Sequence, residues 1–330
     1  MGVDFRKFRL FSAPMAGFTN IAYRELLRHL GGVDLIATEM VSARSFIELD
    51  KRNLDEPSRL YGVREEAQPL SVQIWDNDPD TLAEFARRLA FDFRVSVIDL
   101  NFGCPAKQIA GRSESGSYLL QFPERIGDIV RRVVLAATPI SVTVKIRLGR
   151  TRDTINAADV AQAVEDAGAA ALTVHGRTAA DMYRGTANWD EIARIRPKLR
   201  KISLIGNGDI RTVDDALFRL RNFPVDGIMI GRAGIDRPWL FRQIGQALRG
   251  EPIDREPTAT ELRELIARHY ELMERRFDKK LVIALMRKFA CRYSTARPGA
   301  RVFRNDICSV QNREEFFQVV DAFLRGEAIE

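Results

Sequence analysis

Ser96-Val-Ile-Asp-Leu-Asn-Phe-Gly-Cys-Pro105 joins a buried strand to an abrupt break in the chain. Residues Val97–Leu100 are short, apolar and rich in β-branched side chains, which is typical of a buried strand. Gly103 and Pro105 end this strand and hold Cys104 at its carboxyl end. In a barrel of parallel strands that end carries the chemistry. A thiol there can donate a proton or act as a nucleophile, and the alternative is a buried, inert cysteine.

Segments of the same kind recur along the chain, and each is followed by a helical or loop segment. They are Phe8–Ala13, Asp34–Thr38, Pro69–Trp75, Ile140–Ile146, Ala171–His175, Ile202–Gly206 and Asp226–Ile230. With the first segment they predict an α/β protein of the (β/α)8 TIM-barrel type. The first of these strands is not followed by the spaced glycines of a dinucleotide-binding fold.

The pattern changes near Glu251, where helical periodicity replaces the alternation of strands and helices. It covers Glu256–Phe277, Lys280–Tyr293 and Arg313–Leu324. We therefore predict a TIM-barrel domain over residues 1–250 and a smaller all-helical domain over residues 251–330.

Composition narrows the class of protein. The chain has 330 residues, of which 45% are hydrophobic, and 51 basic against 45 acidic residues give a net charge of +6. That charge permits a polyanionic partner. Its three cysteines are far apart, which favours neither a disulfide framework nor a metal site. Neither a signal peptide nor a membrane span is predicted, so we expect a cytoplasmic protein without a membrane partner.

Polar residues and glycines follow the predicted strands at their carboxyl ends, where they should face one mouth of the barrel. They are Pro14, Met15, Ala16, Gln73, Asn101, Cys104, Lys145, His175, Asn207, Gly208, Asp209, Gly231 and Arg232. The loops after the last two strands of such barrels often bind phosphate through backbone N–H groups. Lys145 can place a charge against an electron-rich ring, and Gln73 and Asn101 can bond ring carbonyls and N–H groups. The set predicts a pocket for a planar, phosphorylated cofactor such as FMN, although each residue alone also fits a turn, a structural histidine or an ordinary ion pair.

The motifs together resemble the tRNA-dihydrouridine synthases, most closely the bacterial B-type branch. They are A-P-M-A-G-F-T-N, S-V-Q-I-W, I-D-L-N-F-G-C-P-A-K, V-K-I-R-L-G, T-V-H-G-R-T, I-G-N-G-D-I and I-G-R-A, in order from about Ala13 to Ala233, with M-R-K-F at Met286–Phe289. The resemblance implies an enzyme that uses FMN and NADPH to reduce the C5=C6 bond of a uridine in the tRNA D-loop.

The resemblance also implies a role for each residue of the barrel mouth. Pro14, Met15, Ala16, Gln73 and Lys145 would hold the flavin ring, and Asn207, Gly208, Asp209, Gly231 and Arg232 would hold its ribityl phosphate. Asn101 and His175 would line the ring or the substrate. Reduced FMN would give a hydride from N5 to uridine C6, and Cys104 would give a proton to C5. The uridine would be flipped out of its RNA stack.

One segment departs from the family pattern. Between Lys107 and Tyr118, Gln108 and Glu114 stand where members of this branch commonly carry basic residues. We expect this glycine- and serine-rich loop to approach RNA, so the change bears on tRNA affinity and on the choice of uridine.

The helical tail carries a basic run. Residues 275–304 contain ten basic residues and one acidic residue, Asp278. The family role implies that tRNA phosphates bind there, through Arg275, Arg276, Lys279, Lys280, Arg287, Lys288 and Arg292. The interleaved Phe289, Tyr293 and Phe303 are expected to stack on bases, and the alternative is a solvated helical face. No stable protein partner is evident.

Two other functions remain open from the sequence. One is an FMN-dependent barrel that acts on a small pyrimidine or enone, which would not need the basic tail. The other is a catalytically silent RNA-binding paralogue, which would hold no flavin. Salt-sensitive binding of tRNA would distinguish the first of these from a tRNA-modifying enzyme.

Overall fold

The chain folds into two compact units. The structure, a computed structural model, describes residues 3–52, 58–295 and 297–326. The first unit comprises the chain up to Gly17 together with Val33–Gly231, and the second comprises Phe18–Gly32 together with the chain from Arg232 onward. Compactness does not test function, so the predicted division of catalysis and tRNA binding near residue 250 stays a prediction.

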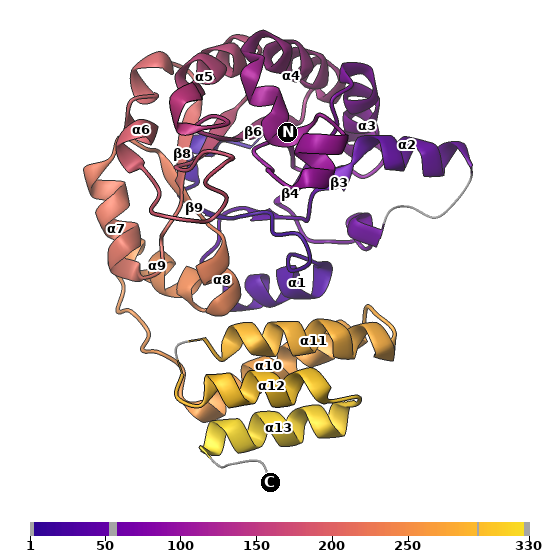
Figure 1. Ribbon diagram of the computed structural model, residues 1–330, viewed down its shortest axis with the longest axis vertical. Helices are drawn as coiled ribbons and strands as arrows, with labels where there is room; N and C mark the ends of the chain where they lie inside the picture. Colours follow the sequence, from indigo (N-terminus) through magenta and orange to yellow (C-terminus); the bar gives the residue numbers. More distant parts are fainter. Residues whose placement is uncertain (1–2, 53–57, 296, 327–330) are drawn as a thin grey trace. The chain divides into compact units, whose positions relative to one another are not determined.

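The first unit is built on a parallel β-barrel (Figure 1). Its strands are β1 (Leu10–Ser12), β2 (Ile36–Ala37), β3 (Val41–Ser42), β4 (Leu70–Trp75), β5 (Val97–Phe102), β6 (Ser141–Arg147), β7 (Ala171–His175), β8 (Ser203–Asn207) and β9 (Gly227–Ile230). They are ordered β1-β9-β8-β7-β6-β5-β4-β2, and β3 pairs with β4. The Ser12 N–H donates to the Leu35 carbonyl at 3.1 Å, which links β1 to the start of β2. The predicted TIM-barrel class is confirmed, and β3 is a short strand that lies outside the eight predicted strand segments.

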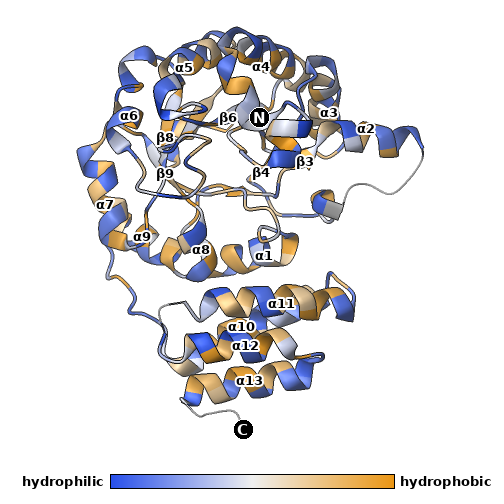
Figure 2. Ribbon diagram, in the orientation of Figure 1, coloured by the Kyte–Doolittle hydropathy of each residue, from blue (hydrophilic) through white to orange (hydrophobic). Residues whose placement is uncertain are grey.

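Helices of the first unit connect successive strands. They are α2 (Ala43–Lys51), α3 (Pro79–Phe91), α4 (Pro123–Ala137), α5 (Ala157–Asp166), α6 (Trp189–Ala193) and α7 (Val213–Asn222). Helix α3 begins with Pro79 in its first turn, and the Asp78 carboxylate accepts from the Thr81 N–H at 2.8 Å. The helices carry hydrophobic residues along one side and hydrophilic residues along the other (Figure 2), as expected for helices that pack on a barrel.

Alternation along the strands separates two layers of side chains. In β5, the apolar Ile98, Leu100 and Phe102 alternate with Val97, Asp99 and Asn101. A cavity inside the barrel is lined by Asp99 of β5 and by polar residues of neighbouring strands, including Ser71, Thr143 and Thr173. The barrel interior is therefore partly polar below its mouth, and this polar layer supports the candidate site.

The second unit is helical. It contains α1 (Ile21–Leu30), α8 (Arg232–Asp236), α9 (Leu240–Arg249), α10 (Ala259–Glu274), α11 (Lys279–Tyr293), α12 (Ala300–Ser309) and α13 (Arg313–Arg325). The three predicted helical stretches correspond to α10, α11 and α13, and α12 was not predicted. Within the described residues, no helix is both long enough and apolar enough to cross a membrane.

Aromatic residues of the basic tail form the core of this unit. Phe289, Tyr293 and Phe303 expose only 0%, 2% and 3% of their surface, and Phe289 stacks on Tyr23 with ring centroids 5.5 Å apart. The expectation that these rings stack on RNA bases is wrong, because they are buried between helices.

Candidate active site

Strand register brings the predicted site residues of the barrel to one end. Asn101 pairs with Lys145 between β5 and β6, and His175 pairs with Asn207 between β7 and β8. Gln73 pairs with Asp99 one step deeper. Because every second residue of a strand points to the same side, these side chains share the inner layer near the carboxyl ends of the strands.

Asn101 ties the Cys104 loop to the barrel interior. Its side-chain oxygen accepts from the backbone N–H groups of Gly103 at 3.0 Å and Cys104 at 2.9 Å. Its side-chain nitrogen donates to the Gln73 oxygen at 3.1 Å, and the Gln73 nitrogen donates to the Asp99 carboxylate at 2.7 Å. The position of Cys104 is thus linked by hydrogen bonds to a buried carboxylate.

The segment after Cys104 folds back on it. Its two helical turns are η3 (Lys107–Arg112) and η4 (Gly116–Gln121), and residues 113–115 between them form a short loop, so part of the predicted glycine- and serine-rich loop is helical. The Cys104 carbonyl accepts from the Ser117 N–H at 3.0 Å. A Cβ on Gly116, which has φ +56°, would lie 2.7 Å from that carbonyl oxygen, so glycine permits this close approach. Cys104 itself stays partly exposed and is a free thiol.

Lys145 places a positive charge beside this loop. Burial, with a smaller effect of Arg147, lowers the pKa of its ammonium to about 8, while Asp99 and Cys104 act in the opposite direction. Within the described ranges, no group accepts a hydrogen bond or ion pair from this ammonium. The side chain is therefore available to an acceptor that the protein does not supply.

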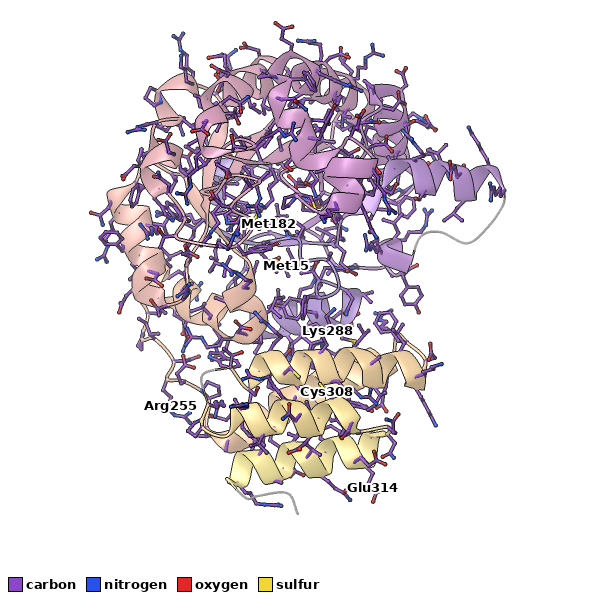
Figure 3. All side chains as sticks on the ribbon, viewed as in Figure 1. Met15, Met182, Arg255, Lys288, Cys308 and Glu314 are labelled. Atoms are coloured by element: carbon purple, nitrogen blue, oxygen red, sulfur yellow. The ribbon has the colours of Figure 1, made fainter. Side chains whose placement is uncertain are left out.

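Arg147 connects the two loops that flank the site. It donates to the Gly103 carbonyl at 3.0 Å, and to the carbonyls of Thr178 and Met182 at 2.8 and 2.7 Å. Burial lowers the pKa of its guanidinium. Met182 and Met15 lie near the centre of the barrel in the view of Figure 3. Arg147 was not predicted as a site residue, although the V-K-I-R motif contained it.

The loop after β8 is fixed by a buried ion pair. Asp209 bonds the Arg177 guanidinium through both carboxylate oxygens, at 2.9 and 2.8 Å, and accepts from the Ala187 N–H at 2.7 Å. Burial acts to raise the pKa of Asp209, but these donors outweigh it and lower that pKa. The Asp209 carboxylate therefore holds the loop in shape through Arg177 and the Ala187 backbone.

Gly208, in the same loop, allows a close approach of the backbone. It has φ +130°, and a Cβ there would lie 2.6 Å from the Ala187 Cβ. Its carbonyl accepts from the Trp189 indole N–H at 3.0 Å. The neighbouring Asn207 donates to the Met229 carbonyl at 2.7 Å. The loop thus presents its backbone closely, as the predicted phosphate role requires.

The remaining predicted residues are divided between the two units. Pro14, Met15 and Ala16 follow β1, and a Cβ on Gly231 would lie 3.4 Å from the Met15 sulfur. His175 is buried, with its Nε2 3.3 Å from an Arg177 nitrogen. Arg232 begins α8 and belongs to the second unit. The functional role of each residue stays a prediction.

The predicted RNA-binding residues differ in how far the second unit already uses them. Arg276 pairs with Glu25, Arg287 donates to the Val310 carbonyl, and Arg292 pairs with Asp236 at 2.6 Å. The others are exposed: Arg275, Lys279, Lys280 and Lys288, of which Lys288 lies over the Phe18 ring at 4.2 Å. These four residues are the better candidates for phosphate contacts.

Comparison with known proteins gives consistent results. The model of a family described as dihydrouridine synthase matches residues 11–328. A probable tRNA-dihydrouridine synthase of Mycobacterium tuberculosis is 36% identical over 94% of this chain and 80% of its own length. The tRNA-dihydrouridine synthase B of Pseudomonas aeruginosa is 36% identical over 93% of this chain and 90% of its own length.

Solved structures share the fold at low sequence identity. An old yellow enzyme homologue from Zymomonas mobilis superimposes with a TM-score of 0.50 and 12% identity, over 77% of this chain and 93% of its own. Histamine dehydrogenase from Rhizobium gives a TM-score of 0.54 and 14% identity, over 80% of this chain and 49% of its own. At such identity they support the barrel fold alone.

Proposed function

Because the chain belongs to the dihydrouridine synthase family, we propose that it reduces the C5=C6 bond of specific uridines in the tRNA D-loop, using FMN and NADPH. The observation that carries this proposal is the proximity of two groups: a free Cys104 thiol, held at the barrel mouth by Asn101, and the Lys145 ammonium, which bonds no acceptor among the residues that the structure describes.

The donor set of the barrel mouth fits FMN. Gln73 keeps a second N–H and a second lone pair after bonding Asp99 and Asn101, which suits a ring edge with alternating carbonyl and N–H groups. Lys145 would face the electron-rich side of the ring, with Pro14, Met15 and Ala16 against it. The backbone at Asn207, Gly208, Asp209 and Gly231, with Arg232, would hold the phosphate. When bound, the flavin supplies the hydride for uridine C6.

Side chains of the protein supply the proton and position the reacting groups. Cys104 holds a proton on Sγ and gives it to uridine C5 as C6 is reduced. Asn101 fixes the backbone of that cysteine, and Arg147 holds Gly103 on one side and Thr178 on the other. The rings of His175 and the exposed Tyr183 lie with their centroids 6.4 Å apart and would line the path of a flipped base.

The exposed basic residues of the second unit support tRNA as the substrate. Arg275, Lys279, Lys280 and Lys288 can neutralise phosphates, and their contribution should weaken as salt rises. The cytoplasmic location, NADPH as the reductant and the absence of a stable protein partner likewise remain proposals.

Dihydrouridine formation tests the proposed function. Purified protein and NADPH are given tRNA that lacks dihydrouridine, and the product is measured by mass spectrometry. Product is expected with the wild type and with Cys308→Ala, but not with Cys104→Ala. A yellow protein that makes no product would favour a barrel acting on a small pyrimidine or enone. A colourless protein that binds tRNA without product would favour the silent paralogue.

A further inference from the structure

We propose that Asp99 is a positioning residue for Cys104: it fixes the direction of the two amide side chains, Gln73 and Asn101, that anchor the cysteine loop. This inference rests on the proposed function only for its consequence in catalysis. The hydrogen bonds that carry it are independent of that function.

Chemistry at the Cys104 end allows one orientation of Asn101. Backbone N–H groups only donate, so the two that meet Asn101, from Gly103 and Cys104, require its oxygen. Its nitrogen must then face the other way. It does so, donating to the Gln73 oxygen at 3.1 Å and approaching the Met40 sulfur at 3.2 Å.

The opposite end of the chain imposes the same direction. Since the Gln73 oxygen accepts from Asn101, its nitrogen must find an acceptor, and the Asp99 carboxylate lies 2.7 Å away. An ionised carboxylate accepts and cannot donate, so it excludes the reversed Gln73. The other Asp99 oxygen accepts from the Thr143 hydroxyl at 2.7 Å.

Burial makes this arrangement restrictive. Asp99, Gln73 and Asn101 expose 4%, 2% and 6% of their surface, so bulk water cannot replace a lost partner. A reversed amide would set two N–H groups, or two oxygens, against each other in the barrel interior. Such a mismatch leaves buried polar groups without a hydrogen-bond partner, which disfavours the reversed orientation.

A purely structural role for Asp99 makes a weaker account. Burial of a carboxyl is unfavourable, and burial raises the pKa of Asp99 against the effect of its hydrogen bonds. Filling the space beside the cavity would not require a charge. The need for a group that only accepts explains why a carboxyl stands at this position.

Moving the carboxylate to the other end of the chain provides a direct test. In Asn101→Asp, the new carboxylate still accepts from Gly103 and Cys104 but can no longer donate to Gln73. Gln73 must then turn its nitrogen toward residue 101 and its oxygen toward Asp99, where two acceptors meet. Adding Asp99→Asn supplies an N–H for that oxygen, and all three side chains are satisfied in the reversed direction.

We therefore expect Asp99→Asn to rescue Asn101→Asp, although it lowers activity when introduced alone. Asn101→Asp should reduce kcat at least tenfold, and the double variant should recover at least fivefold of that loss. Thr143→Val is the matched control, because it also removes a hydrogen bond of Asp99 but offers Gln73 no donor. In the Asn101→Asp background it should give no recovery.

Alkylation of Cys104 gives a readout that needs no turnover. Iodoacetamide modifies each variant, and mass spectrometry compares Cys104 with the exposed Cys308 in the same molecule. The ratio of the two rates should rise several-fold in Asn101→Asp, because residue 101 still accepts from the loop but is no longer held in place by a matched bond to Gln73. The ratio should return toward the wild-type value in the double variant. Flavin content and melting temperature are measured for each variant.

Additive effects of the two substitutions, in both kcat and the alkylation ratio, would overturn the proposal. If Asn101→Asp does not fold, recovery of folded protein and of the wild-type alkylation ratio in the double variant supports the proposal, and failure of both variants to fold counts against it. If the wild type makes no dihydrouridine, the proposed function fails, and the alkylation ratios alone decide the role of Asp99.

Discussion

Replacement of Lys145 by methionine should stabilise the flavin-free protein while it abolishes flavin binding. Lys145 is held in the barrel with a pKa lowered from 10.5 to about 8, mainly by burial. Its charge is thus less favourable in the folded than in the unfolded state. At 1.36 kcal/mol per unit of pKa, this difference corresponds to about 3 kcal/mol at neutral pH. Methionine has a similar length and carries no charge.

The pH dependence fixes the sign of the effect. Below pH 8 the ammonium is charged in both states, and its whole cost opposes folding. Between pH 8 and 10.5 the folded state releases its proton first, so the wild type gains stability as pH rises. The advantage of Lys145→Met should therefore be largest at pH 7 and small near pH 10.5.

Thermal unfolding of flavin-free protein measures this effect. At pH 7 we expect Lys145→Met to melt about 6–12 °C above the wild type, using about 2–4 °C per kcal/mol for a unit of this size. The exposed Lys198 serves as the control, and Lys198→Met should change the melting temperature little at either pH. A Lys145→Met protein that melts lower than the wild type at pH 7, or a difference that does not depend on pH, would refute the reasoning.

Three further predictions concern the support of the site, the second unit and the tRNA surface. Gly206→Ala would place a Cβ 2.3 Å from the Trp189 ring, whose N–H bonds the Gly208 carbonyl. We expect the variant to lose about 1–3 kcal/mol of stability and to retain less flavin, as measured by absorbance. A stable, fully yellow variant would contradict this. Burial lowers the pKa of His269 to about 3 from 6.5, so the unfolded state gains a proton first as pH falls, and urea unfolding should show about 2 kcal/mol lost between pH 6.5 and pH 5. A His269→Phe protein should lack that loss, and an equal loss in both proteins would assign it to other groups. Lys279→Gln with Lys280→Gln should weaken tRNA binding and reduce the slope of log Kd against log salt by about 1 to 2, whereas Lys198→Gln should leave the slope unchanged.

Local patterns of hydrophobic residues predicted most of the barrel. The β-branched runs around Val97–Leu100 and Ala171–His175 predicted strands within two residues of their observed ends, because fully buried parallel strands are apolar on both faces. Alternation also placed Gln73, Asn101 and Lys145 on the inner layer together. The short β3 and helix α12 were missed, since neither has a distinctive period of its own.

Partners across the fold were less accessible from the sequence. Asp99 was one polar residue inside a strand, and its link to Cys104 depends on the register between β4 and β5. Asp209 fitted a phosphate loop, yet its carboxylate is bound by Arg177 from the loop after the preceding strand. In the basic tail the sequence gives the number of charges. It does not predict that Arg292 pairs with Asp236 or that Phe289 is buried, because both depend on how the helices pack.

The most direct test of the central claim is a single turnover without oxygen. Enzyme reduced in advance is mixed with tRNA that lacks dihydrouridine, and flavin oxidation is followed by absorbance while the tRNA is analysed by mass spectrometry. We expect the wild type to oxidise its flavin and form one dihydrouridine per flavin, and Cys104→Ala to do so at least a hundredfold more slowly with the same flavin content. Flavin oxidation without dihydrouridine, or a Cys104→Ala variant as fast as the wild type, would contradict the account.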